Sequence, residues 1–230
     1  MNSEFADLDT LALARLKDRG FKPQCIFDVG AAHGGWSKKI HGIFREAHFH
    51  MFEPAYTEVD DYKTHIDKLI ESEPDKFTIH PDALGSTNQI QKIFINRGNP
   101  VGNTLLDSKF TRNNWDPVDT HVATIDHIVQ SASAAQPDLI KIDVQGGELE
   151  VLKGATHTLI DTQVLLLELW LDRGYGPTTP LFHEIINWLL PFGFHVVDFT
   201  GTYRKPDNRL ISQDMLFAHE SAPICEQYKF

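Results

Sequence analysis

The amino-acid sequence predicts an α/β protein whose mostly parallel sheet is covered by helices on both faces. Short apolar runs that fit buried strands alternate with segments of helical spacing along most of the chain. Three of these runs, residues 26–29, 139–144 and 164–170, are apolar almost throughout, as strands buried on both faces require. This alternation is typical of a sheet enclosed between two layers of helices.

Composition bounds the class of protein. The chain has 230 residues, of which 41% are hydrophobic, and we expect one domain spanning residues 1–230. The net charge of −11, without any basic block, argues against nucleic-acid binding and against binding to an anionic membrane. Residues 1–20 lack a signal-peptide pattern and no segment has transmembrane length, so we expect a soluble, cytoplasmic protein. The two cysteines, Cys25 and Cys225, are interpreted as free thiols.

The predicted elements follow one another with short connections. In the first half, helices are expected within residues 1–22, 36–44 and 59–71, and strands at residues 26–29, 48–52, 77–80 and 91–95. In the second half, residues 122–126 lead into a helix through residue 129. Strands follow at 139–144, 164–170, 194–199 and 215–219, with helices from residue 148 and over 181–190. We expect the last two strands to form an antiparallel pair that closes the sheet.

Two segments are predicted to face a substrate. Residues 96–117 are polar and irregular, and their aromatic and amide side chains favour a functional loop over a disordered insertion. Residues 173–180 are rich in glycine and proline and follow the carboxyl end of an expected strand. Both segments are therefore expected at the ligand-binding edge of the sheet.

A glycine-rich turn follows the first expected strand and opens a helix, at residues 25–37. Such a turn presents backbone N–H groups at the carboxyl edge of the sheet, where open α/β sheets bind small ligands. A dinucleotide fingerprint would have glycine at the position of Ala32. Asp28 would repel a diphosphate but suits a cationic ligand. The turn, with Gly30, Ala31 and Gly34, therefore favours S-adenosylmethionine over NAD.

Acids at the next strand ends extend this binding site. Glu53 ends the second expected strand, 25 residues after Asp28, where a carboxylate can accept both hydroxyls of a ribose. A short turn of small and polar residues, including Asp82 and Ala83, follows the third strand. We expect an adenine there, with its amino group donating to Asp82 and its ring meeting nearby backbone N–H groups.

Several stretches together resemble the FkbM-type S-adenosylmethionine-dependent methyltransferases. They are residues 26–31 (IFDVGA), 52–54 (FEP) and, as the most specific, 139–155 (LIKIDVQGGELEVLKGA). Softer matches are residues 103–106, 124–126, 167–168 and 214–217. The sequence differs from the family's usual pattern at three positions. Ala32 stands for Asn, Gln145 for Glu, and Ile125 for Leu.

The resemblance implies the Rossmann-like fold of class I methyltransferases. This fold is a three-layer sandwich around a mostly parallel seven-stranded sheet with an antiparallel strand near the carboxyl terminus. It also implies methyl transfer to a small-molecule acceptor, usually a hydroxyl of a sugar or secondary metabolite. The sequence names neither the acceptor nor the oligomeric state.

Acids at the fourth and fifth strand ends are the catalytic candidates. Asp143 and Glu168 are expected to be neighbours in one cleft, with Lys141 facing the same way as Asp143 by period-two alternation. We expect a metal-free site in which Asp143 orients or deprotonates the acceptor and Lys141 keeps Asp143 ionised. His33, in the glycine turn, is the alternative base or else a polar residue facing water.

Three other functions stay open at this point. A dehydrogenase is disfavoured by Ala32 in the glycine turn. A nucleic-acid methyltransferase is disfavoured by the acidity of the chain and by the lack of an Asn-Pro-Pro-aromatic motif. A cofactor-binding module of methyltransferase fold without turnover would bind the cofactor but modify no acceptor.

Overall fold

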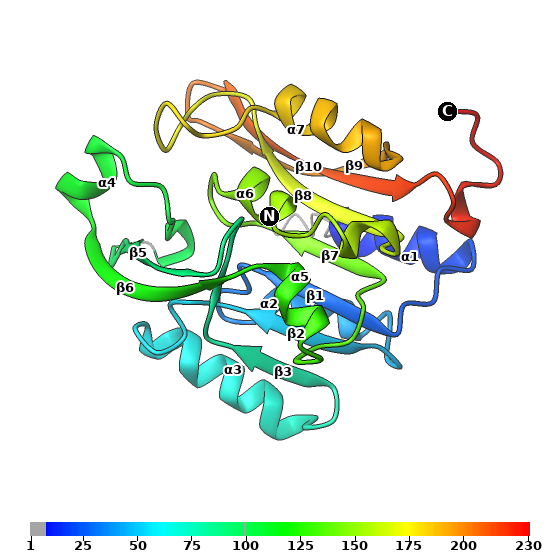
Figure 1. Ribbon diagram of the computed structural model, residues 1–230, viewed down its shortest axis with the longest axis horizontal. Helices are drawn as coiled ribbons and strands as arrows, with labels where there is room; N and C mark the ends of the chain where they lie inside the picture. Colours follow the sequence, from blue (N-terminus) through cyan, green and yellow to red (C-terminus); the bar gives the residue numbers. More distant parts are fainter. Residues whose placement is uncertain (1–7, 99) are drawn as a thin grey trace, which may run out of the picture.

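The computed structural model describes residues 8–98 and 100–230, and its main element is a seven-stranded sheet (Figure 1). The strands are β1 (Cys25–Val29), β2 (His48–Phe52), β3 (Phe77–His80), β7 (Leu139–Ile142), β8 (Val164–Trp170), β9 (Phe194–Arg204) and β10 (Leu210–His219). Their order is β3-β2-β1-β7-β8-β10-β9. Strand β10 is antiparallel to both neighbours and the other pairs are parallel, which confirms the predicted sheet.

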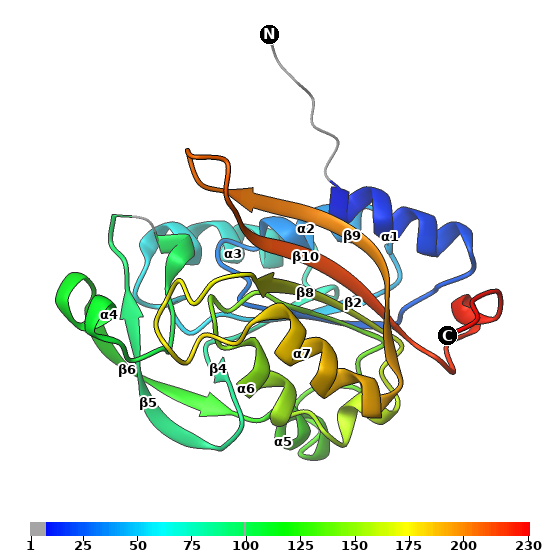
Figure 2. The same ribbon diagram turned by 90° about the horizontal axis from the view of Figure 1, so that it is seen from above.

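Helices cover both faces of this sheet. Figure 2 shows α1 (Leu8–Asp18), α2 (Gly35–His41) and α3 (Asp60–Ser72) on one side, and α5 (Ile125–Gln130), α6 (Glu148–Lys153) and α7 (Phe182–Leu189) on the other. Each layer shares a hydrophobic cluster with the strand residues that face it. In β1, Ile26 belongs to the first cluster, whereas Phe27 and Val29 belong to the second. Both faces of β1 are buried, and this explains why its apolar residues are continuous rather than alternating with polar ones.

A second, smaller sheet was not predicted from the sequence. It consists of β4 (Ala83–Leu84), β5 (Gln89–Ile95) and β6 (Asp116–Ala123), in the order β4-β6-β5. The expected irregular loop at residues 96–117 contains a 3-10 turn (Pro100–Gly102), the helix α4 (Lys109–Asn114) and the start of β6. The polar first half of β6 is held by its antiparallel pairing with β5 rather than by a buried apolar face. Local periodicity could not reveal that pairing.

The two ends of the chain also differ from expectation. Strands β9 and β10 are longer than residues 194–199 and 215–219, because their pairing continues through polar residues. In Figure 2 the tip of this hairpin projects away from the body of the molecule. Of the expected leading helix at residues 1–22, residues 1–7 lie outside the described part, and α1 packs beside the edge strand β9. Its buried stripe contains Leu13, whereas Leu8 and Leu11 are exposed.

The remaining short turns are 3-10 segments at Thr158–Ile160, Leu190–Phe192 and Pro223–Cys225. Cys25 and Cys225 are buried free thiols. Within the described residues, every helix is too short or too polar to cross a membrane.

Candidate active site

A cavity of about 390 Å³ opens at the carboxyl ends of β1, β2 and β7, and the second sheet forms its opposite wall. This is the edge of an open α/β sheet at which ligands bind, and the volume is that of a small-molecule site. Of the residues singled out in the sequence, the wall includes Gly30, Ala31, His33, Glu53, Asp82, Ala83, Lys141 and Asp143. Asp28, Gly34 and Glu168 lie outside it.

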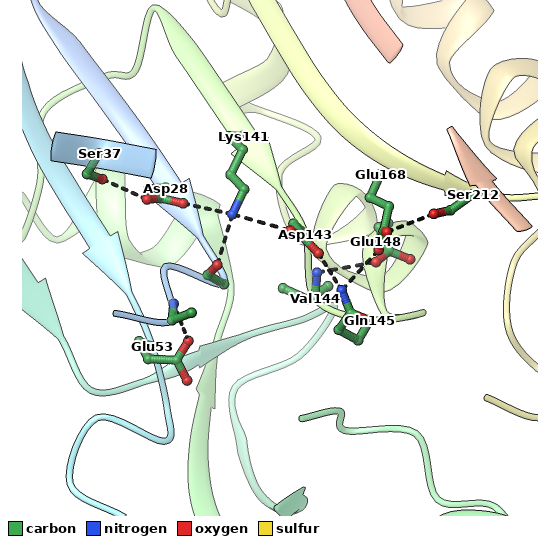
Figure 3. A network of polar contacts seen from close by, with 12 residues as sticks. Asp28, Ser37, Glu53, Lys141, Asp143, Val144, Gln145, Glu148, Glu168 and Ser212 are labelled. Carbon is green, nitrogen blue, oxygen red and sulfur yellow. Dashed lines mark hydrogen bonds and ion pairs between the residues drawn. The ribbon is translucent and has the colours of Figure 1, made fainter. Parts of the chain in front are cut away.

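Asp28 lies beneath the cavity in a buried ion pair. It is fully buried and stands opposite Lys141 on the neighbouring strand β7, so the Lys141 Nζ lies 3.0 Å from Asp28 Oδ1 (Figure 3). The Ser37 hydroxyl donates to the other oxygen at 2.7 Å. Lys141 Nζ also donates to the Gly30 carbonyl at 2.9 Å. Asp28 thus supports Lys141 from beneath the cavity, and its expected contact with a ligand stays a prediction.

The charge of Lys141 is fixed by its neighbours. Burial opposes the ammonium form, but the charges of Asp28 and Asp143 outweigh this effect and raise the pKa of Lys141 above its ordinary value. The Nζ atom lies 3.7 Å from Asp143 Oδ2, farther than from Asp28. Lys141 thus stays charged and links the buried acid to the acid on the cavity wall.

The turn after β1 requires a left-handed backbone. Gly30 has a φ of 79°, and a side chain there would collide with the carbonyl oxygen of Asp143 at the end of β7. The N–H groups of Gly30 and Ala31 donate to the Phe52 carbonyl, at 3.0 and 3.2 Å. Glycine is needed because the ends of β1 and β7 meet without space for a Cβ atom.

Gly34 packs against α3 and does not line the cavity, so its expected role in cofactor binding stays a prediction. Its φ is 75°, and an added Cβ atom would meet the side chains of Ile66 and Leu69 in α3. Gly35, the next residue, lies on the cavity wall instead. His33 is exposed at the rim, with its ring centroid 6.0 Å from that of His65. His33 thus lies on the cavity wall and stays exposed to solvent.

Glu53 is a buried acid on the cavity wall. Its Oε2 accepts from the Ala32 N–H at 2.8 Å and its Oε1 from the Ala55 N–H at 2.9 Å. Burial raises the pKa of Glu53 to about 7, although these two bonds favour the carboxylate. Because each carboxylate oxygen can accept a second hydrogen bond, both remain able to bind hydroxyl groups.

Asp82 and Ala83 lie where the main sheet meets the second sheet. Asp82 is half-buried on the wall and leads into β4, which pairs with β6. Leu84 and Val122 of these strands line the same side of the cavity. This side is therefore largely apolar, with one carboxylate at its edge.

Asp143 and Glu168 are brought together through Gln145, whose amide nitrogen lies between them (Figure 3). The Nε2 atom is 2.6 Å from Asp143 Oδ1 and 3.0 Å from Glu168 Oε2. Asp143 is on the cavity wall, and its side chain is 38% exposed. Glu168 lies behind Gln145, where it accepts from the Ser212 hydroxyl at 2.9 Å. The predicted acids are thus neighbours, but Asp143 is the member of the pair that faces the cavity.

Burial and neighbouring acids disfavour the charged form of Glu168. Burial, followed by the charges of Asp143 and Glu148, raises the pKa of Glu168 to about 9. Asp214 stands directly opposite it on β10, and burial raises the pKa of Asp214 to about 7. Both Glu168 oxygens accept hydrogen bonds, one from Gln145 and one from Ser212.

Glu148, in the first turn of α6, is part of the structure of this edge. It is fully buried, and its Oε1 accepts from the N–H groups of Gly146 at 2.9 Å and Val144 at 3.3 Å. Burial raises the pKa of Glu148 to about 7. The sequence placed Glu148 in the first turn of a helix. It did not reveal that the preceding turn folds back so that its N–H groups donate to the Glu148 carboxylate.

Two further residues were missed. Tyr175, in the predicted loop 173–180, donates its hydroxyl to Gln145 Oε1 at 2.5 Å. Thr104, in the predicted segment 96–117, donates to the Gln145 carbonyl at 2.8 Å. The sequence predicted that both segments face a substrate. It also singled out Gln145, because this residue stands where the family usually has glutamate. Within residues 8–98 and 100–230, no three His, Cys, Asp or Glu side chains are grouped so as to hold a metal ion.

Comparison with solved structures identifies the fold. An FkbM methyltransferase from Methylobacillus flagellatus superposes with a TM-score of 0.52 at 18% sequence identity, over 84% of this chain and 43% of that chain. TrmK from M. capricolum, solved with S-adenosylhomocysteine, superposes with a TM-score of 0.51 at 7% identity, over 93% of this chain and 69% of that chain. At these identities the likeness concerns the fold alone, that of class I methyltransferases.

Sequence comparison identifies the family. Hexuronic acid methyltransferase AglP of Haloferax volcanii is 41% identical over 59 residues, which are 26% of this chain and 25% of that protein. The chain thus matches about a quarter of that relative's length. The family model of the methyltransferase FkbM domain matches residues 28–196, well over half of the chain. The match includes the glycine turn, Glu53, Asp143 and Glu168, and the chain belongs to the FkbM methyltransferase family.

Proposed function

We propose that this protein transfers a methyl group from S-adenosylmethionine to a hydroxyl of a sugar or secondary metabolite. The observation that carries the proposal is Asp143 on the wall of the cavity, backed by Lys141 and Gln145. Family membership supports methyl transfer. The short match to a hexuronic acid methyltransferase supports a sugar-like acceptor.

The cavity wall suits S-adenosylmethionine, which supplies an activated methyl group when bound. Glu53 would accept from the ribose hydroxyls, Asp82 from the adenine amino group, and the turn at Gly30 and Ala31 would hold the methionine end. The wall carries several acids, and its lysine, Lys141, is already paired with Asp28. This charge disfavours the diphosphate of NAD and fits a ligand with a cationic end.

The chain's own residues would position the acceptor and manage its proton. Asp143 would accept the hydrogen bond of the acceptor hydroxyl and take its proton as the oxygen attacks in line. Lys141 would hold the Asp143 carboxylate from below, and Glu168 would stand behind Gln145 without contacting the acceptor. His33, at the rim, is the alternative base. No metal is required in this scheme, so activity lost with EDTA and restored by magnesium or manganese would overturn that part.

Cofactor binding is tested by thermal unfolding. S-adenosylhomocysteine is expected to raise the melting temperature, because binding to the native state stabilises by roughly 2.7 kcal/mol at a hundredfold excess over Kd. NAD at the same concentration is expected to give no shift. A shift with NAD alone, or no shift with either compound, would contradict the proposed cofactor.

Acceptor identity is tested by a screen for S-adenosylhomocysteine release. Hydroxylated sugars, uronic acids and secondary metabolites form one panel, and transfer RNA forms the comparison arm. Turnover of a small hydroxylated compound and none of RNA is the expected result. A protein that binds S-adenosylhomocysteine but modifies no compound would be a binding module without turnover. The cytoplasmic location stays a prediction of the sequence.

A further inference from the structure

Gln145 has an unusual backbone conformation for a residue other than glycine. Its φ is 58°, in the left-handed region, and Gly146 follows with a φ of 99°. Residues with side chains adopt this region at a cost, and such positions occur where the surrounding structure imposes them. Here the Thr104 hydroxyl holds the Gln145 carbonyl, and Glu148 holds the N–H of Gly146. The turn is thus fixed from two sides.

This conformation aims the Gln145 amide at the acids (Figure 3). Its nitrogen donates to Asp143 at 2.6 Å and to Glu168 at 3.0 Å. Its oxygen accepts from the Tyr175 hydroxyl at 2.5 Å. Burial raises the pKa of Tyr175, so the phenol keeps its proton and donates. These partners define the orientation of the amide, because the Tyr175 hydroxyl donates to its oxygen while oxygens of Asp143 and Glu168 accept from its nitrogen.

The Tyr175 ring ties this contact to the loop at 173–180. Its centroid lies 5.1 Å from that of Trp170 and 5.9 Å from that of Trp115, both in edge-on arrangements. Trp115 ends α4, which belongs to the other predicted substrate-facing segment. Gln145 is therefore contacted by both segments, through Thr104 on its backbone and Tyr175 on its side chain.

We propose that Gln145 is a positioning residue for Asp143 and that Tyr175 makes this positioning depend on the seating of the loop 173–180. The inference rests on the proposed function, in which Asp143 serves the acceptor. Gln145 holds Asp143 Oδ1 while Lys141 faces Oδ2, so the carboxylate keeps one orientation toward the cavity. When the loop is displaced, the amide loses its anchor and Asp143 can turn toward Lys141. Acceptor-side loop closure thereby sets the geometry of the proposed base.

The first test removes single groups. Tyr175→Phe deletes the hydroxyl and keeps the ring, and is expected to lower kcat about tenfold with unchanged affinity for S-adenosylhomocysteine. Gln145→Glu keeps the shape but replaces the donor with a carboxyl group that donates only when protonated. The kcat of Gln145→Glu is expected to fall as pH rises through the pKa of the introduced carboxyl group. The pH profile of wild-type kcat is expected to lack this decrease. Wild-type kcat in Tyr175→Phe, or a wild-type pH profile in Gln145→Glu, would overturn the proposal.

A matched variant separates positioning from general loosening of the loop. Arg173 lies in the same loop but bonds the Thr179 carbonyl and Glu184, away from Gln145. Arg173→Ala leaves the hydroxyl of Tyr175 available to Gln145, so it is expected to raise KM for the acceptor more than it lowers kcat, whereas Tyr175→Phe does the reverse. The same division of effects in both variants would reduce Tyr175 to a loop-packing residue.

A second measurement does not depend on turnover. Hydrogen exchange over residues 173–180 is expected to be faster in Gln145→Ala than in the wild-type protein, because the Tyr175 hydroxyl loses its acceptor. Unchanged exchange would contradict the link between Gln145 and the loop. If the wild-type protein turned over no acceptor, the proposed function would fail, while the exchange result would still decide whether the link exists.

Discussion

At the scale of single residues, Asp143 connects the buried ion pair of Asp28 and Lys141 to the wall of the cavity. Lys141 lies closer to Asp28 than to Asp143, at 3.0 against 3.7 Å. Asp28 therefore pairs with the ammonium inside the sheet, and Asp143 approaches it from the surface of the cavity. Removing one partner of a buried pair leaves the other charge uncompensated. The pair thus links the interior of β1 and β7 to the proposed chemistry.

Asp143→Asn is expected to lower turnover by roughly a hundredfold or more, as for loss of a general base. The asparagine has the same shape and can still meet Gln145, so the fold and the affinity for S-adenosylhomocysteine should change little. Steady-state kinetics and calorimetric titration measure the two quantities. If turnover stayed within a few-fold of the wild-type value, Asp143 would not be the general base, and that role would pass to His33 or another residue.

Glu53→Ala is expected to weaken S-adenosylhomocysteine binding by roughly 1.5–3 kcal/mol, the range for hydrogen bonds to a charged group. Part of this loss comes from the stranded N–H groups of Ala32 and Ala55. A double cycle with an analogue lacking both ribose hydroxyls separates the two contributions. The mutation should cost the analogue less affinity than it costs S-adenosylhomocysteine. Equal losses of affinity for the two compounds would show that Glu53 stabilises the turn but does not bind the ribose hydroxyls.

At the scale of elements, the junction of β1 with β7 shapes the binding edge. Gly30 ends β1 so closely against the Asp143 carbonyl that a Cβ atom cannot be accommodated. The Asp143 N–H donates to the Val29 carbonyl at 3.0 Å, one step before the turn. A side chain at Gly30 would therefore force the strands apart where they carry Lys141 and Asp143.

Gly30→Ala and Gly20→Ala form a matched pair for this junction. Both glycines have positive φ, but an added Cβ at Gly20 would meet nothing within 4 Å. Gly20→Ala should cost roughly 1–2 kcal/mol for the left-handed backbone alone. Gly30→Ala should cost at least about 1 kcal/mol more, because overpacking adds to the strain. Urea unfolding measures both, and equal losses would show that the two strand ends can separate freely.

At the scale of the whole molecule, several buried carboxyls weaken the fold at high pH. Burial raises the pKa of Glu53 and Glu148 to about 7, and that of Glu168 to about 9, from a usual value of 4.5. Between the unfolded and folded pKa, the unfolded chain has released protons that the folded state retains. Stability therefore falls as pH rises through this interval.

Glu168→Gln is expected to stabilise the protein increasingly as pH rises. The glutamine stays neutral in both states, so the mutant escapes a loss worth about 1.36 kcal/mol per pH unit at full effect. With neighbouring acids titrating too, a gain on the order of 2 kcal/mol is expected between about pH 5 and pH 8. Urea unfolding at several pH values measures it, with Glu71→Gln on the exposed surface of α3 as the control. A difference independent of pH would contradict the raised pKa of Glu168.

The sequence by itself determined the main sheet and the position of the binding edge. Strands β2, β3 and β8 begin and end where predicted, because each is a short apolar run bounded by polar or turn residues. The glycine turn and the acids at strand ends were also readable, since parallel strands bring their carboxyl ends to one edge. Fold and edge follow from residues that are contiguous in the chain.

The tertiary structure decided which residues meet at that edge. Register placed Asp28 opposite Lys141, and the wrapping of α3 turned Gly34 away from the cavity. The second sheet and the contacts of Tyr175 and Thr104 with Gln145 join segments far apart in the sequence. Burial likewise raised the pKa of Glu168, because desolvation depends on every neighbour packed around a carboxyl. Spacing along the chain encodes local structure, whereas pairing and desolvation are sums over contacts that exist only in the folded protein.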